Sequence, residues 1–330
     1  MHSSLIAWIL RAIPFGTIIM YGALGETVTE KSGNLNLGVP GIMYLGGFAG
    51  FASAWAYENT AANPSGAVSV VIALTCAILA SMAGGLIYAV RTISLRANQN
   101  VTGLALTTFG MGVANFFGVF ILNGASYSAA PIANKAFSAK IPVLSTLGGF
   151  GQVVFSYGFL VYAAIALAIA LHWFLTRTRA GLNLRAVGEN PATADAAGIN
   201  VTLYKYLATC IGAGICGIGG LYYVLDYNQG IWATTGQIEA LGWLAVALVI
   251  FTTWKPLNAI WGAYLFGMLY WLYQFLPTLL GITMASHITD LVQMLPYVVT
   301  IVVLIVVSMR KKKENQPPAH LGLAYFREER

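Results

Sequence analysis

Charged residues are scarce in this sequence. Only 8% of the 330 residues are charged, and 58% are hydrophobic. An ordinary soluble domain carries roughly 25% charged residues. So few charges cannot cover the surface of a soluble protein of this length, and we expect the remaining surface to face hydrocarbon. The sequence therefore indicates an integral membrane protein.

Cysteine and histidine are also few and dispersed. The three cysteines, Cys76, Cys210 and Cys216, lie in apolar runs, where cysteine behaves as a small hydrophobic residue, so we expect free thiols. The four histidines are scattered, and neither an H-E-x-x-H motif nor a cluster of carboxylates accompanies them. We expect this chain to bind no metal and no cofactor.

Motifs for catalysis and nucleotide binding are missing. The sequence has no G-x-x-x-x-G-K-[ST] loop, so the chain is not expected to hydrolyse ATP alone. Residues 212–217 spell G-x-G-x-x-G, but they lie inside an apolar run and not between a strand and a helix. No nucleophile has an obvious base, and the basic residues form no aromatic-rich patch. We therefore expect neither an enzyme nor a nucleic-acid-binding protein.

Long apolar runs fill most of the chain. With about 20 residues taken as one crossing, they predict an all-α, polytopic transmembrane helical bundle of about nine or ten membrane segments, some of them broken or re-entrant. The domain is expected to cover residues 1–309, followed by a tail at 310–330. The predicted spans are 5–24, 37–56, 67–90, 100–122, 154–175, 204–226, 239–253, 257–276 and 291–309.

Basic residues predict the orientation of these spans. They occur at alternate connections, and positively charged connections lie preferentially on the cytoplasmic side. This places the C-terminal tail in the cytoplasm and residues 123–152 outside. The side of the N-terminus stays open, because the glycine-rich segment 35–57 is a candidate re-entrant helix. The basic positions are Arg91, Arg96, Arg177, Arg179, Arg185, Lys255 and Arg310 to Lys313.

Few ionisable residues lie within the predicted spans. Arg11, together with Glu26 and Glu30 near the first connection, are the exceptions. Ionisable groups inside a membrane commonly serve proton or ion relays, so their scarcity disfavours an ion-coupled transporter and suits a conduit for an uncharged solute. Gly46 and Gly50, and the glycines between residues 212 and 220, predict faces where helices pack closely.

A polar loop at residues 176–203 carries a short predicted helix. Asn190 can cap it, Pro191 suits its first turn, Asp195 can complement its dipole, and Gly198 can end it. Such a helix could dock into a soluble partner or could be an ordinary structured loop. Physical reasoning alone leaves both open.

The same loop resembles a known motif. Gly188-Glu-Asn-Pro191, followed by Ala196-Ala-Gly-Ile199, resembles the coupling-helix loop of bacterial ABC importer permeases in the branched-chain amino acid, sugar and nucleoside group. The resemblance implies that the loop receives an ATPase subunit, which would bind the ATP and magnesium. The residues implied in this coupling are Gly188, Glu189, Asn190, Pro191, Ala197 and Gly198.

Residues 24–41 are similar to the first membrane connection of that family, although many relatives have Glu where Pro40 stands. Glycine and asparagine so dense beside apolar helices indicate irregular backbone, which membrane depth tolerates only against protein or a water-filled cavity. Asn34 and Asn36 could line a pathway or cap a helix, while Glu30 with Lys31 is expected to form an interfacial charge pair. The candidate pathway residues are Glu26, Asn34, Asn36, Gly38 and Gly41.

Two further segments resemble the same family. Residues 242–267 are similar to its second-half membrane segments, which implies an inverted internal repeat relating residues 37–51 to 241–251. Trp254, beside Lys255, is expected to be an interface anchor. Residues 318–330 resemble the tail of the nucleoside-uptake branch, although their composition alone predicts a solvated charged tail.

Together these resemblances imply a multi-pass permease of the bacterial inner membrane that imports a small neutral solute, with a nucleoside as the leading candidate. A simple sugar such as ribose, or an ATP-independent transporter or channel, is the alternative. The implied partners are a second related permease, a double-cassette ATPase, an extracytoplasmic substrate-binding lipoprotein and membrane lipid. The sequence leaves open whether the permease pair is homodimeric.

Overall fold

The computed structural model describes residues 2–121, 127–140, 148–233, 236–281, 286–310 and 316–327. Of the described residues, 81% are helical and almost none are in strands. The only sheet within the described residues pairs β1 (Tyr127–Ala129) with β2 (Ile231–Ala233) in antiparallel register, with Ser128 opposite Trp232. The expectation of an all-α bundle is confirmed.

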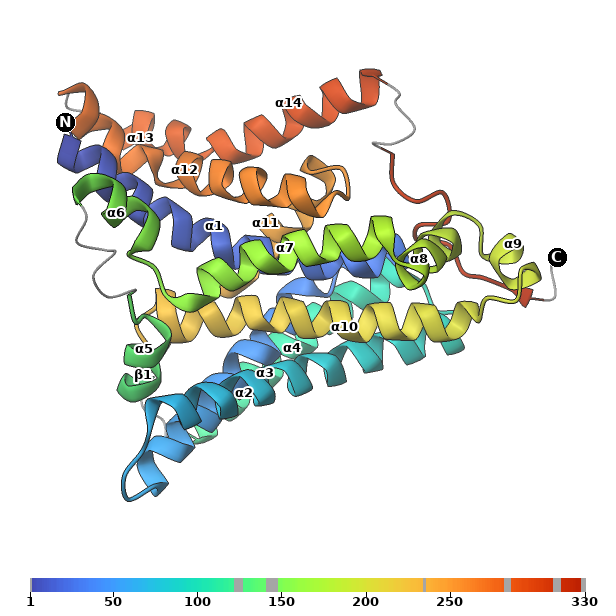
Figure 1. The fold of residues 1–330 in the computed structure, drawn as a ribbon, viewed down its shortest axis with the longest axis horizontal. Helices are drawn as coiled ribbons and strands as arrows, with labels where there is room; N and C mark the ends of the chain where they lie inside the picture. Colours follow the sequence, from blue (N-terminus) through green and yellow to red (C-terminus); the bar gives the residue numbers. More distant parts are fainter. Residues whose placement is uncertain are drawn as a thin grey trace.

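Nine helices account for the nine predicted spans, and most run roughly along the long axis of the molecule (Figure 1). Five of the described helices, α1, α3, α4, α7 and α10, are long and apolar enough to cross a membrane. The nine are α1 (His2–Lys31), α2 (Val39–Thr60), α3 (Gly66–Ala89), α4 (Gln99–Ile121), α7 (Phe159–Arg177), α10 (Val201–Tyr222), α11 (Gln237–Phe251), α12 (Pro256–Leu280) and α14 (Leu295–Arg310).

Short elements occupy the two ends of the bundle. One end carries β1, α5 (Pro131–Phe137) and α6 (Gly148–Phe155), and the other carries α8 (Arg179–Glu189), α9 (Pro191–Ala196) and the described tail residues 316–327 (Figure 1). We call the second of these the α8–α9 end. The remaining elements are α13 (Ser286–Gln293) and two π-helical turns, η1 (Val90–Ser94) after α3 and η3 (Tyr223–Tyr227) after α10.

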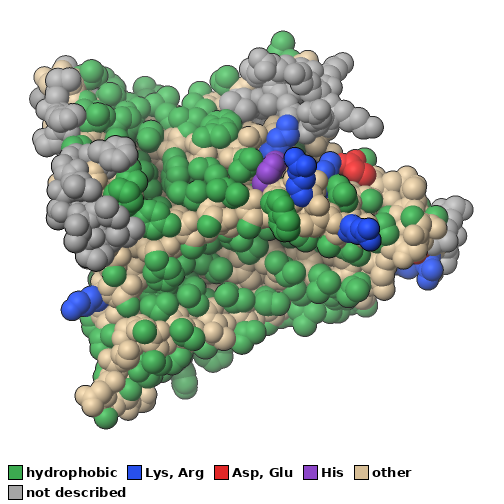
Figure 2. All heavy atoms as spheres, in the orientation of Figure 1, with side chains coloured by type: hydrophobic (Ala, Val, Ile, Leu, Met, Phe, Trp, Pro, Cys, Tyr) green, Lys and Arg blue, Asp and Glu red, His purple; other side chains and the backbone are tan. Residues whose placement is uncertain are grey.

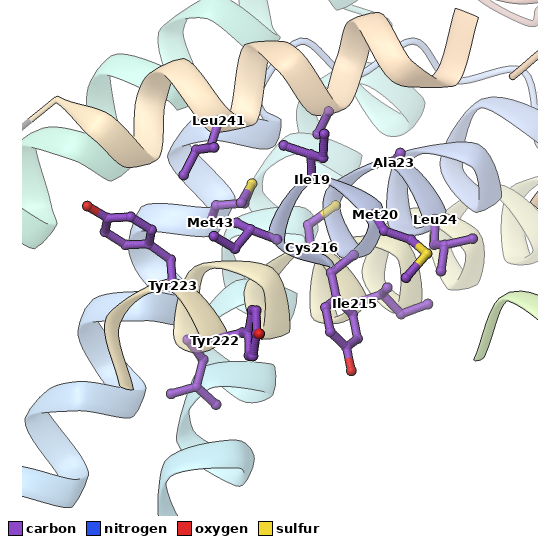
Figure 3. Close-up of a cluster of buried hydrophobic side chains, with 14 of the residues drawn as sticks. Ile19, Met20, Ala23, Leu24, Met43, Ile215, Cys216, Tyr222, Tyr223 and Leu241 are labelled. Atoms are coloured by element: carbon purple, nitrogen blue, oxygen red, sulfur yellow. The ribbon is translucent and has the colours of Figure 1, made fainter. Parts of the chain in front are cut away.

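Helix α1 lies at the centre of the core. Its apolar side chains pack among residues of α2, α10 and α11, where Met43, Cys216 and Leu241 surround them (Figure 3). Small residues let the backbones approach: a Cβ added to Gly22 would lie 2.6 Å from the Ala245 Cβ. The close packing follows from the van der Waals attraction that holds helices together in lipid.

The predicted glycine-rich packing faces are confirmed. A Cβ on Gly46 in α2 would lie 2.5 Å from the Gly217 Cα in α10, and a Cβ on Gly47 would lie 2.9 Å from the Gly220 carbonyl oxygen. Substitution of these glycines would force α2 and α10 apart.

The outer surface of the bundle is apolar along most of its length. Figure 2 shows hydrophobic side chains over the middle of the visible face, with most of the charged ones gathered toward the α8–α9 end. Phe120 is 71% exposed and Trp173 is 61% exposed. Exposed apolar area on this scale is disfavoured in water and suits contact with lipid. The protein is therefore a multi-pass membrane protein.

Candidate functional site

The first connection is shorter than the sequence predicted. Helix α1 continues to Lys31, so Glu26 and Glu30 lie inside a helix and not in an irregular segment. The helix continues because Gly25 fits against the backbone of Gly212 in α10, and it ends at Gly33, whose φ of +89° suits only glycine well. Residues 32–38 form the irregular segment that remains, and we call them the connection.

Side chains of other helices satisfy the backbone of the connection. The Leu35 amide donates to Gln99 Oε1 at 2.7 Å, and the Leu35 carbonyl accepts from the Tyr88 hydroxyl at 2.5 Å. The Leu37 carbonyl accepts from the Thr107 hydroxyl at 2.9 Å. A buried backbone group left without a partner would cost about 1–3 kcal/mol. The prediction of irregular backbone held against protein is thus confirmed.

Three candidate pathway residues meet at this connection. Glu26 Oε1 accepts from the Asn36 amide at 2.9 Å, and Asn36 Oδ1 accepts from the Gly38 amide at 2.9 Å at the start of α2. Asn34 donates to the Thr209 hydroxyl of α10 at 3.1 Å. Asn36 therefore supports the start of a helix, whereas Asn34 joins the connection to α10. Buried Glu26 Oε2 and Asn34 Oδ1 have no hydrogen-bond partner among the described residues.

The two candidate glycines hold α2 against its neighbours. A Cβ on Gly38 would lie 2.7 Å from the Leu106 side chain, and one on Gly41 would overlap the Leu106 carbonyl oxygen of α4. Pro40, between these glycines, suits the first turn of α2. A Cβ added to Gly242 of α11 would lie 2.5 Å from the Pro40 Cα. The segments 37–51 and 241–251, which the implied repeat relates, therefore touch at Pro40 and Gly242.

Trp254 is not an interface anchor, contrary to expectation. It is only 6% exposed, and its indole N–H donates to the carboxylate of Glu30, itself 2% exposed. Glu30 attracts Lys31 as expected, but the pair is not at an exposed interface, because Glu30 is buried and accepts a hydrogen bond from Trp254. A tight turn after α11, with φ near +54° at Thr253 and Trp254, directs the indole inward.

The short capped helix predicted after Asn190 is present. Helix α9 has Pro191 in its first turn, and Asn190 caps it by accepting from the Thr193 amide at 3.0 Å. Gly198, with φ of +84°, ends it in a Schellman motif: its amide bonds the Asp195 carbonyl, and the Ile199 amide bonds the Ala194 carbonyl, both at 3.0 Å.

A second helix, α8, precedes it. Thr178 caps α8 by accepting from the Gly181 amide at 3.0 Å. The sequence carried this signal, since Thr is a favoured capping residue directly before such a helix. The candidate coupling residues therefore lie at a junction of two helices, with Gly188 and Glu189 ending α8, Asn190 between them, Pro191 starting α9, and Ala197 and Gly198 after it.

Gly188 links this junction to the connection. A Cβ on Gly188 would overlap the Lys31 carbonyl oxygen and would lie 3.2 Å from the Gly33 amide nitrogen. Only glycine lets the two backbones lie so close. The end of α8 is therefore in direct contact with the end of α1 and the start of the connection.

The described tail residues are docked on the bundle, although several of them stay exposed, whereas composition alone predicted a solvated tail. The His320 amide donates to the Gly188 carbonyl at 3.0 Å, and the Gly322 amide donates to the Gly33 carbonyl at 3.1 Å. The tail thus bridges α8 and the connection. Only the tertiary structure reveals this docking, because the contacts use backbone groups that carry no sequence signal.

Asp195 has a role other than the predicted complement to the helix dipole. It lies beyond the first turn of α9, and its Oδ2 accepts from the Tyr325 hydroxyl at 2.9 Å and from Arg327 Nε at 3.1 Å. Asp195 therefore fastens the end of the tail to α9. Tyr325 also packs against the small apolar cluster of Val187, Ala194 and Val201.

Two cavities open near these elements. The larger, of about 620 Å³, lies among η1, the start of α10 and the tail, and the smaller, of about 340 Å³, is lined by Lys31, Arg185 and Lys255. Neither is lined by any of the five candidate pathway residues. No cluster of three or more His, Cys, Asp or Glu residues occurs within the part of the chain that the structure describes.

Comparison with known proteins places the chain in a family. The pattern of the family described as "Branched-chain amino acid transport system / permease component" matches residues 8–306. The nucleoside ABC transporter permease protein of Lactococcus lactis is 30% identical over 292 residues, which cover 88% of this chain and 88% of the relative.

Two further relatives are also named as ABC transporter permeases. The guanosine ABC transporter permease protein of Bacillus subtilis is 33% identical over 253 residues, which cover 74% of this chain and 75% of the relative. A Haloferax volcanii protein provisionally named a glucose ABC transporter permease is 34% identical over 272 residues, which cover 81% of this chain and 77% of the relative. Because the family pattern spans nearly the whole sequence, this chain belongs to the family of branched-chain amino acid transport system permease components.

Proposed function

We propose that this chain is one membrane subunit of an ABC importer, and that it carries a nucleoside across the bacterial inner membrane. The α8–α9 end faces the cytoplasm, so the C-terminal tail is cytoplasmic, which the positive charge of the connections at this end supports. An ATPase subunit with two cassettes binds ATP and magnesium and docks on α8 and α9. A second related permease completes the membrane pore, and a lipoprotein outside the cell delivers the substrate.

One observation carries the coupling role. The backbone of Gly188 is in direct contact with Lys31 and Gly33, so α8 cannot move without displacing the connection. The connection in turn is hydrogen-bonded to α1, α3, α4 and α10 through Glu26, Tyr88, Gln99, Thr107 and Thr209. A push on α9 therefore reaches four helices of the bundle through one short segment.

The proposed mechanism has two states. Closure of the cassettes on ATP displaces the Glu189–Gly198 segment, and the displaced connection switches the pathway between outward and inward access, so that ATP biases a two-state element. Glu26, Asn34, Asn36, Gly38 and Gly41 border that pathway. The buried unpaired oxygen of Asn34 supports this assignment, since a hydroxyl-rich solute could donate a hydrogen bond to it.

The relatives support a nucleoside as the substrate. Two of them are named nucleoside and guanosine permeases, and the Lactococcus lactis relative matches 88% of the chain. A simple sugar such as ribose is the second candidate, because the Haloferax volcanii relative carries a glucose permease name at 34% identity. Both substrates are neutral and rich in hydroxyl groups.

Alanine replacement of Glu189 and Asn190 in the assembled complex tests the coupling role. Loss of the Asn190 cap weakens α9 by about 1 kcal/mol. We expect the complex to assemble but to lose substrate-stimulated ATPase activity and uptake. The matched control is Asn59→Ala, which removes an exposed asparagine that bonds its own helix at the opposite end of the bundle. Normal coupling in the Glu189/Asn190 variant would reject the assignment.

Uptake by the complex in proteoliposomes tests the substrate. Labelled guanosine, ribose and glucose are offered with the purified lipoprotein, with and without ATP inside the vesicles. We expect ATP-dependent uptake of the nucleoside alone. Uptake of a sugar instead would establish the second candidate, and uptake without ATP or an ATPase subunit would show a secondary transporter or channel.

A further inference from the structure

The larger cavity at the α8–α9 end adjoins the proposed coupling segment, which lines it through Asp195 and Gly198. Four parts of the chain form it: η1 with the turn that follows, the end of α9 with the residues after it, the start of α10, and the tail. Among the six proposed coupling residues, only Gly198 lines it. Its volume of about 620 Å³ suits a small ligand, since such pockets measure roughly 300–1,000 Å³.

Positive charge dominates this cavity. Arg96, Lys205 and Arg327 line it, and Asp195 is the lining carboxylate. Asp195 already accepts from Arg327 and from the Tyr325 hydroxyl. Among the described lining residues the cationic side chains outnumber the one carboxylate, and the Arg96 guanidinium lies 4.5 Å from the centre of the Phe326 ring.

The burial of Lys205 supports an anion site independently of the cavity's net charge. It is only 3% exposed, and among the residues described in the structure its ammonium group has no hydrogen-bond or ion-pair partner. His320 of the tail, whose pKa the nearby charge of Lys205 helps to lower, provides no compensating negative charge. A buried ammonium without an anion is strongly unfavourable, whereas one that binds an anion is stabilised by charge-assisted hydrogen bonds.

The start of α10 adds amide donors to the same cavity. Val201 and Thr202 line it at the first two positions of this 22-residue helix, where amides have no carbonyl partner within the helix. The Asn200 side chain caps the next amide, that of Leu203, at 3.0 Å and leaves the first two amides to another acceptor. Amides at a helix N-terminus together with a lysine one turn further on are a common arrangement for binding phosphate.

We propose that this cavity binds the phosphate group of an anionic ligand through Lys205, Arg96 and the first amides of α10. A phospholipid headgroup and a soluble phosphorylated compound present the same oxygens. Leu203 and Leu207, on the same helix as Lys205, are each about half exposed, so an acyl chain could continue along them. The bound phosphate would join η1, α10 and the tail.

The test uses the complete complex purified in a neutral detergent. Binding is measured by thermal shift with inorganic phosphate against chloride at equal ionic strength, and by native mass spectrometry with short-chain phosphatidylglycerol against phosphatidylcholine. The variants are Lys205→Met, Lys205→Arg and Arg96→Gln. The matched control is Arg91→Gln, because Arg91 is an exposed arginine of η1 that does not line the cavity.

Lys205→Met and Arg96→Gln should each weaken binding by about tenfold or more, the usual effect of losing one charge-assisted hydrogen bond. Lys205→Arg should retain most of the binding, and Arg91→Gln should match the wild type. A response to phosphate alone identifies a soluble ligand, and a response to phosphatidylglycerol identifies lipid.

Equal responses of the wild type and Lys205→Met to both probes would overturn the proposal. So would release of the ATPase from Lys205→Met without any response of the wild type to either probe, because a partner carboxylate would then be the counter-ion. If the complex with Lys205→Met does not assemble, the responses of Arg96→Gln and the wild type to the two probes are compared instead. Equal responses would again overturn the proposal.

Discussion

The amide of His320 in the tail donates a hydrogen bond of 3.0 Å to the carbonyl oxygen of Gly188 at the end of α8. Gly188 itself lies against the backbone of Lys31 and Gly33. The C-terminal tail, the proposed coupling helices and the first connection of the membrane domain thus meet at one glycine. Most of the following predictions test this meeting point.

Gly188→Ala should destabilise the protein by about 1–3 kcal/mol, because the new methyl group would overlap the Lys31 carbonyl oxygen. The measurement is thermal unfolding of the purified complex in detergent. The control is Gly112→Ala in α4, where an added Cβ has open space and alanine favours the helix. Equal melting temperatures for the two variants would contradict the tight contact.

Trp254→Phe should destabilise the protein by about 1–3 kcal/mol, because Glu30 loses its indole donor while it stays buried. A double-mutant cycle with Glu30→Gln should give a coupling energy of about 1 kcal/mol. Trp261→Phe is the control, since Trp261 is 52% exposed and its loss should change stability by less than about 0.5 kcal/mol. Additive effects of the two substitutions would show that the bond contributes nothing.

Tyr325→Phe should loosen the tail. The hydroxyl group donates to Asp195 at 2.9 Å, and loss of such a bond costs about 1 kcal/mol, or roughly fivefold in the population of the undocked tail. Hydrogen exchange should accelerate at the His320 and Gly322 amides, which are bonded to Gly188 and Gly33. Tyr297→Phe, at a half-exposed tyrosine of α14, should leave these amides unchanged. Unaltered exchange in Tyr325→Phe would refute the fastening role of Asp195.

Tail docking should weaken at acidic pH. Burial and the nearby charge of Lys205 lower the pKa of His320 in the docked state. An undocked His320, with a usual pKa of about 6.5, then binds a proton more readily than the docked one, so protonation favours the undocked tail. The stabilisation is present above about pH 6.5 and is lost as the pH falls below this value.

Hydrogen exchange of the Gly322 amide, corrected for the intrinsic pH dependence of exchange, measures this loss. The control is His320→Gln, which cannot titrate and should show protection that does not change over the same range. A flat profile for the wild type would exclude His320 as the titrating group.

The nine predicted spans matched helices because apolar runs of that length have few other stable arrangements in lipid. The cap at Asn190 and the glycine at Gly198 were equally readable, since local hydrogen bonding and a positive φ decide both. The C-terminal end of α1 was harder to predict from the sequence. Residues 25–31 are polar in part, and they stay helical because Gly25 packs on Gly212 far away in the sequence.

The sequence could not predict which side chains contact each other when they lie far apart along the chain. Trp254 beside Lys255 has the local signature of an interface anchor, yet a turn directs it onto Glu30, 224 residues earlier. Gln99, Tyr88 and Thr107 carry no motif, although they satisfy the backbone of the connection. These three residues have this role because the tertiary structure places their helices beside the connection.

The sequence by itself determined that this chain crosses a membrane many times and carries a short capped helix at one end, because hydrophobic length, charge placement and capping are local properties. The tertiary structure alone decided that the helix end, the connection and the tail touch at Gly188, and that Lys205 lines a cationic cavity. These features depend on close approach of backbones distant in sequence, and the physical requirement to pair buried polar groups holds them there.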